Sequence, residues 1–141
     1  MIKTTEIIRF LEELSGLDYD DIQPHTDIFK DLNIVGDDFH DMIEKFAKLY
    51  SVDMSNYPWY FHADEEGFNT GSLFFKPPYQ RVKRIPITPE MLTSFANTGS
   101  WDFKYPPHEI PKKRYDLLIN RLIFGLCLIF MFFILFKKCK S

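Results

Sequence analysis

The chain has 141 residues, of which 45% are hydrophobic and 26% charged, and its formal net charge is −3. This length allows one soluble domain of about 105 residues with a linker and an anchor. Residues 1–110 hold nineteen Asp/Glu against ten Lys/Arg, a net charge of −9, whereas residues 111–141 hold one acidic and seven basic residues, a net charge of +6. An acidic domain lacks the basic footprint of nucleic-acid binding, so we expect no nucleic-acid partner.

The first predicted element is a helix over residues 5–15. Thr4 and Thr5 are N-cap candidates and Gly16 is suited to end the helix, and between them apolar residues recur at helical spacing, namely Ile7, Ile8, Leu11 and Leu14. A long loop over 17–35 follows. We expect its apolar residues to pack on the core: Ile22, Ile28, Phe29, Leu32 and Ile34.

A second helix is predicted over residues 38–50, with Asp37 or Asp38 as its cap. It has the clearest amphipathic pattern in the chain, with an apolar stripe of Phe39, Met42, Ile43, Phe46, Ala47 and Tyr50. Polar residues occupy the other side. We call Asp37, Asp38, Asp41 and Glu44 the acidic face.

The next segment is less regular. The aromatic run from Tyr57 to Phe61 is typical of core packing, and the alternative is the lining of a ligand groove. Two β-prone runs, Leu73–Lys76 and Arg84–Ile87, are expected to pair as a short hairpin around Pro77-Pro78. Thr88-Pro89-Glu90 then starts a short helix that Gly99 ends, and the proline-rich segment 101–111 is expected to be extended.

The C-terminal part predicts a transmembrane helix over residues 117–136. Fifteen consecutive uncharged residues, Leu122–Phe136, have no polar face, and with residues 117–121 the run reaches the length of a bilayer's hydrocarbon core. A core helix that is apolar all round needs a larger protein around it. Arg121 can extend its charge toward the headgroups.

Basic residues flank both ends of this helix, so charge alone does not set its orientation. The first ten residues contain no apolar stretch of signal-peptide length. We therefore expect a single-pass protein whose N-terminal domain is cytoplasmic, in the inner membrane if the host is a Gram-negative bacterium. The expected parts are a domain (1–105), a proline-rich and basic linker (106–116), the membrane helix (117–136) and a basic tail (137–141).

The first fifty residues resemble an acyl carrier protein. Such a carrier has a helix, a long loop ending in Asp-Leu-Gly, and an Asp-Ser-Leu that opens the second helix and whose serine carries phosphopantetheine. Here Asp31-Leu32 and Gly36-Asp37-Asp38-Phe39 follow that order with one extra residue, and Asp38 occupies the position of the serine. A carboxylate cannot form the phosphodiester, so the resemblance implies a mainly α, carrier-like fold without the prosthetic group or any other cofactor.

Residues 1–107 are also similar to a bacterial family, the domain of unknown function 1493. The similarity is carried by Asp31–Asp38, which follows Asp-Leu-x-Ile-x-Gly-Asp-Asp, and by the Thr-led helix ending near Trp101. In carriers the acidic second helix docks on basic patches of partner enzymes, which implies a docking role for the acidic face.

The expected function is therefore non-catalytic: a membrane-tethered domain that binds a partner protein with a basic surface. Other functions remain open, namely a genuine acyl carrier in lipid metabolism, an immunity or antitoxin-type partner, and a hydrolase or metal-dependent enzyme that uses His40. We expect no catalytic or metal site, because His40 and Glu44 form one ligand pair at helical spacing without a further His or Cys.

Overall fold

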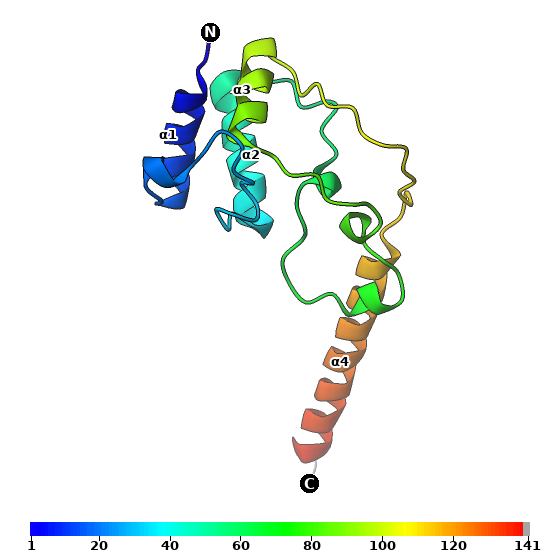
Figure 1. Cartoon of the computed structure of the whole chain (residues 1–141). Helices are drawn as coiled ribbons and strands as arrows, with labels where there is room; N and C mark the ends of the chain where they lie inside the picture. The colour runs from blue at the N-terminus through cyan, green and yellow to red at the C-terminus, as the bar shows by residue number, and fades with distance from the viewer. Residues whose placement is uncertain (140–141) are drawn as a thin grey trace. The chain divides into compact units, whose positions relative to one another are not determined.

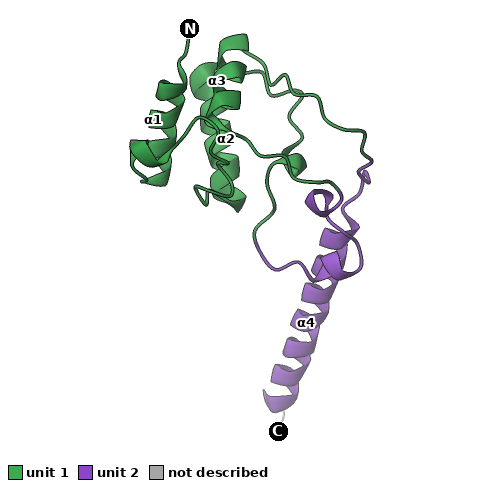
Figure 2. Ribbon diagram, viewed as in Figure 1, with its two compact units in different colours: residues 1–66, 82–108 green, residues 67–81, 109–141 purple. Residues whose placement is uncertain are grey.

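The structure is a computed structural model that describes residues 1–139, and its contacts divide it into two compact units. The first unit contains residues 1–66 and 82–108, and the second contains residues 67–81 and 109–141 (Figure 2). Segment 67–81, which lies inside the expected domain 1–105, thus belongs to the same unit as the C-terminal helix.

The first unit contains three α-helices (Figure 1). Helix α1, Thr4–Ser15, begins at Lys3, whose backbone N–H donates to Glu6 Oε1 over 3.1 Å, and it ends at Gly16 in the left-handed conformation, at a φ of 68°. The predicted helix 5–15 is thereby confirmed. Its buried residues are Ile7, Ile8 and Leu11.

Helix α2, Gly36–Tyr50, buries the predicted stripe at Phe39, Met42, Ile43 and Phe46. It begins earlier than predicted, and the expected cap is wrong. Val35 is the N-cap residue and no side chain caps the helix, while Asp37 and Asp38 lie within its first turn. The earlier start is possible because Gly36 adopts a φ of +50°, which strains other residues.

Helix α3, Pro89–Thr98, has the predicted ends: the Thr88 hydroxyl accepts from the Met91 N–H, and Gly99 closes the helix at a φ of 71°. The N-terminus of α1 is tied to α3, because the Asn97 side chain hydrogen-bonds both the N–H and the C=O of Ile2. The ring of Phe10 on α1 also contacts Phe46 on α2, with the ring centroids 6.4 Å apart. One hydrophobic cluster therefore includes side chains from all three helices.

The long loop between α1 and α2 is fastened to this cluster, as predicted. It contains a 3-10 turn at Tyr19–Asp21, and its residues Ile22, Ile28, Leu32 and Ile34 are buried. The Ile28 N–H donates to the carbonyl of Ile87, and Arg84 makes a two-pronged ion pair with Asp27 at 2.5 and 3.1 Å.

The expected β-hairpin is wrong, since residues 1–139 contain no strand and only an isolated bridge between Asp53 and Ser100. Leu73 ends a 3-10 turn (η3, Thr70–Leu73), and another turn follows at Pro78–Gln80 (η4). Segment 84–87 bonds to loops instead, because the Ile85 N–H donates to Phe61. Pro77, Pro78 and Pro86 lack the N–H groups that a ladder needs.

The segment after α3 is not merely an extended spacer. The Trp101 side chain is buried, and its ring packs against Phe95 with a centroid separation of 4.4 Å. Tyr105 packs on Phe61 at 4.9 Å. The chain up to Tyr105 is therefore part of the core, and a tertiary contact overrides the extended appearance of the sequence.

The second unit is built around α4, Tyr115–Cys139. Residues Tyr115–Lys138 form the helix in the described part of the chain that is long and apolar enough to cross a membrane, and no residue of its most apolar stretch is buried. It includes the whole predicted span 117–136. The last two residues of the predicted basic tail lie outside the described residues.

Candidate functional site

The acidic face lies along the exposed side of α2. Asp37, Asp41 and Glu44 follow the i, i+4, i+7 spacing that places side chains on one side of a helix, and Asp38 lies beside them in the first turn. All four residues are exposed. The positive end of the helix dipole favours carboxylates in this first turn.

The four carboxylates differ in their partners. Glu44 Oε1 accepts from Lys48 Nζ over 2.6 Å, and this hydrogen bond lowers the pKa of Glu44. Within residues 1–139, the side chains of Asp37, Asp38 and Asp41 take part in no ion pair or hydrogen bond. Three negative charges are thus available to an external cation.

A cavity of about 230 Å³ adjoins two of these carboxylates. It lies between the end of α1, the loop before α2 and the first turns of α2. Its lining residues are Leu14, Ser15, Leu32, Asn33, Ile34, Asp38, Asp41, Met42 and Lys45. The structure therefore brings Asp38 and Asp41 together with apolar side chains, whereas Asp37 and Glu44 do not line the cavity.

His40 is half-buried and packs against the aromatic segment. Its ring lies 5.5 Å from that of Trp59, edge to face. In the described chain, no group of three or more His, Cys, Asp or Glu side chains is arranged to hold a metal ion. The contact that the structure shows for the His40 ring is thus packing against Trp59.

Phe61 of the aromatic run Tyr57–Phe61 is buried and the other residues of the run are half-buried, and the run leads to a residue that the sequence analysis did not single out. His62 is fully buried, and its ring stacks on Tyr57 at 5.6 Å. His62 Nδ1 lies 3.0 Å from the carbonyl oxygen of Ile85, and Nε2 lies 2.7 Å from the Tyr105 hydroxyl. Trp101 Nε1 donates to that same hydroxyl over 2.6 Å.

These contacts define where the protons lie. A carbonyl only accepts, so Nδ1 of neutral His62 carries the hydrogen, and Nε2 then accepts from the Tyr105 hydroxyl. Burial lowers the pKa of His62 to about 4, and burial raises the pKa of Tyr105 to about 12. Both groups are therefore neutral near pH 7, as expected for a satisfied core network. No pattern of local spacing signals it, because its members lie 43 residues apart.

A family model described as "protein of unknown function (DUF1493)" matches residues 5–104. The chain belongs to this family. No curated protein and no solved structure matches the chain significantly. The acyl-carrier resemblance of the DUF1493 domain accordingly stays a hypothesis from the sequence.

The DUF1493 match covers α2, α3 and all of α1 except its first residue, and it ends before α4. Within the segment Asp31–Asp38, Leu32 and Ile34 are buried, and the side chain of Glu66 lies over Gly36 where a Cβ would stand. Packing therefore accounts for the apolar and glycine positions of this segment. It does not account for Asp37 and Asp38, which are exposed.

Proposed function

We propose that this protein is a non-catalytic, membrane-tethered domain that docks a partner protein with a basic surface through its acidic face. The observation that carries the proposal is the set of three exposed, unpaired carboxylates, two of which adjoin a cavity with apolar lining residues. None of the three carboxylates takes part in an ion pair or a hydrogen bond within the described residues.

The arrangement suits protein recognition. Charges on a rim steer association and set its salt dependence, whereas an apolar side chain inserted into a neighbouring cavity slows dissociation. Asp38 and Asp41 provide negative charge beside the single cation of Lys45, and Leu32, Ile34 and Met42 are among the lining residues. The fitting partner element is a segment with Lys or Arg residues around one apolar side chain.

The proposal includes membrane attachment through α4, with the domain on the cytoplasmic side, which is the inner-membrane face in a Gram-negative host. Lys112, Lys113 and Arg114 precede α4 and suit anionic headgroups, but lysines also lie at the other end of α4, so the proposed side has to be tested directly. Cleavage of the domain by protease in inverted vesicles, with protection in intact spheroplasts, is the expected result. Cleavage in spheroplasts alone would contradict this sidedness.

The direct test is to purify the full chain from native membranes in mild detergent and to identify the proteins that co-purify. Combining Asp37→Asn, Asp38→Asn and Asp41→Asn should weaken recovery of the specific partner by about tenfold or more, and high salt should weaken it for the native chain too. The matched control removes three other exposed carboxylates by Glu13→Gln, Glu90→Gln and Asp102→Asn. Equal losses in the two variants would contradict a localised docking face.

The same purified protein separates the alternatives. A phosphopantetheine-sized increase in intact mass would support a genuine carrier and contradict the role given to Asp38. An immunity or antitoxin role predicts a toxic partner, so deletion of this gene would be lethal only in the presence of the partner's gene.

A further inference from the structure

The loop that packs against the beginning of α4 exposes large apolar side chains. We call residues 67–75 the interface loop; it contains the 3-10 turn η3. Phe68 is 92% exposed, Leu73 83% and Phe74 67%. So many exposed apolar side chains in one short loop indicate a surface that contacts something other than water.

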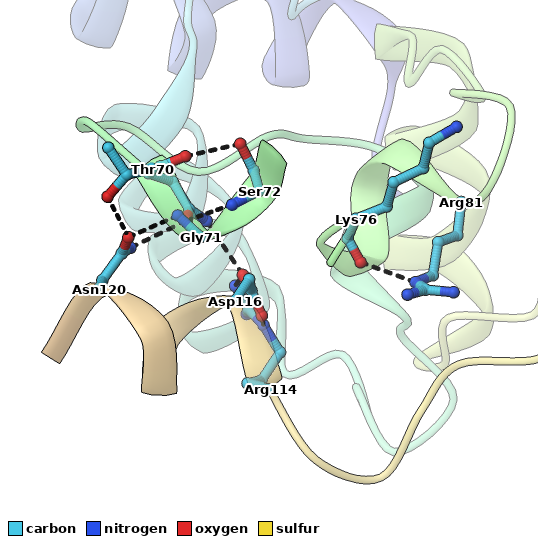
Figure 3. Close-up of polar contacts among 9 residues, drawn as sticks. Thr70, Gly71, Ser72, Lys76, Arg81, Arg114, Asp116 and Asn120 are labelled. Atoms are coloured by element: carbon cyan, nitrogen blue, oxygen red, sulfur yellow. Dashed lines mark hydrogen bonds and ion pairs between the residues drawn. The ribbon is translucent and has the colours of Figure 1, made fainter. Parts of the chain in front are cut away.

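Hydrogen bonds fix this loop to the first turns of α4 (Figure 3). Asn120 Oδ1 accepts from the Gly71 N–H at 2.7 Å and from the Thr70 hydroxyl at 2.8 Å, and its Nδ2 donates to Asn69 Oδ1 at 2.9 Å. Asn69 also donates to Asp116 over 3.0 Å, and Arg114 forms an ion pair with that carboxylate at 2.6 Å. A Cβ on Gly71 would clash with the Asp116 backbone, so only glycine permits this approach.

The depth of the loop follows from its attachment. At about 1.5 Å per residue the apolar run Leu122–Phe136 spans roughly 22 Å, about 8 Å less than a 30 Å hydrocarbon core. Residues 117–121 must therefore lie at the edge of that core when α4 spans a bilayer. The loop bonded to residue 120 lies at the same level.

The interface loop is suited to that environment. Four of its backbone N–H groups have partners within the protein: those of Phe74 and Phe75 donate to Gly71, that of Ser72 donates to Asn69, and that of Gly71 donates to Asn120. The Asn120 amide, which would be costly beside lipid, has all the partners described above. A polar residue at the start of the apolar helix is thereby explained.

The charges next to the loop also fit a lipid surface. Lys76, Arg81 and Lys113 are exposed, and they surround a small hollow together with Arg114. The Nε–H of Arg81 donates a hydrogen bond to the backbone carbonyl of Lys76 over 2.7 Å (Figure 3). Arg114 is paired with Asp116, so the other three cations provide the net positive charge that anionic headgroups attract.

We propose that the interface loop inserts Phe68, Leu73 and Phe74 into the boundary between headgroups and acyl chains of the bilayer that α4 crosses, with Lys76, Arg81 and Lys113 at the lipid phosphates. This second membrane contact rests on the proposed anchoring by α4. The inserted interface loop would restrain α4 at its first turns.

The test uses the full chain with Cys127→Ser and Cys139→Ser, reconstituted in nanodiscs of phosphatidylcholine and phosphatidylglycerol. A nitroxide is attached at one introduced cysteine in each of four variants: Phe74→Cys, Leu73→Cys, Ile129→Cys in α4, and Leu49→Cys, an exposed leucine of α2. Power saturation compares access of oxygen, which dissolves in lipid, with access of a water-soluble nickel chelate. We expect the labels at 73, 74 and 129 to favour oxygen and the label at 49 to favour the chelate.

The outcomes separate the two proposals. Labels at 73 and 74 that behave like the label at 49, beside a lipid signature at 129, would overturn the loop insertion and leave the anchor intact. A label at 129 that favours the chelate would overturn both. Labels at 73 and 74 shielded from both reagents would indicate a protein contact and also overturn the insertion.

Discussion

At the scale of single residues, the buried side chain of His62 links three segments of the first unit, those that contain Tyr57, Ile85 and Tyr105. Its two nitrogens contact the Ile85 carbonyl and the Tyr105 hydroxyl, and its ring stacks on Tyr57. A protonated His62 has to donate from Nε2 as well, which forces the Tyr105 hydroxyl to reverse its role. The network therefore stabilises only the neutral histidine.

This requirement predicts a pH-dependent stability. Because the pKa of His62 is about 4 in the folded chain against 6.5 for the ordinary group, the unfolded chain binds more protons between these values. Stability is thus fully present above pH 6.5 and falls as the pH drops toward 4, by on the order of 3 kcal/mol. Urea unfolding in detergent, followed by the fluorescence of Trp59 and Trp101, measures this slope.

Two variants identify the source of the slope. His62→Gln should lower stability at pH 7 and remove much of the dependence between pH 6.5 and 4. The control His25→Gln changes an exposed histidine and should leave the slope as it is. An unchanged slope in His62→Gln would assign the effect to other groups.

At the scale of elements, the contact of η3 with α4 depends on one small residue. Gly71→Ala should separate the turn from the helix, because the added Cβ meets the backbone of Asp116. Loss of the two bonds to Asn120, each of about 1 kcal/mol, should speed amide exchange across residues 71–75 by about tenfold or more.

Hydrogen exchange of the full chain in detergent measures this effect. The control Gly125→Ala places a methyl on α4 where no atom lies within 4 Å, so exchange in the loop should stay the same. Equal protection in the native chain and Gly71→Ala would contradict the close approach.

The sequence predicted the elements whose signals are local. Helical spacing and the end residues Gly16, Thr88 and Gly99 were sufficient for α1 and α3, and the apolar run was sufficient for α4. The prediction of a hairpin was wrong because segment 84–87 hydrogen-bonds to loops around Ile28 and Phe61, which lie far away in the chain. The role of Asn120 could not be predicted from the sequence, since its partners Thr70 and Gly71 lie about fifty residues earlier.

At the scale of the whole molecule, the large hydrophobic cluster belongs to the first unit alone. All of its buried members lie within residues 1–66 and 82–108. A chain that ends after His108 should therefore remain soluble and unfold cooperatively in urea. Segment 67–81 should become sensitive to protease in this shortened chain, because the helix α4 that it packs against is absent. Absence of a cooperative transition would contradict an independent domain.

One part of the candidate site could be predicted from local sequence spacing, and the other part depends on contacts between distant segments. The acidic face could be identified from spacing on one helix, and Asp37, Asp38 and Asp41 are indeed exposed. The cavity beside them could not be predicted, because the end of α1 and the loop at Leu32–Ile34 line it together. Within that loop Asn33 adopts a left-handed φ of 53°. Its existence depends on how α1 and α2 pack.

The central claim is that a partner protein docks at the acidic face and its cavity. The most direct measurement is photo-cross-linking in native membranes from a benzophenone amino acid at Lys45, which lines the cavity, compared with one at Glu90 on the first turn of α3. We predict a discrete protein adduct from position 45 that disappears with Asp37→Asn, Asp38→Asn and Asp41→Asn, and no such adduct from position 90. Position 45 giving no adduct, or the same adducts as position 90, would contradict the docking role.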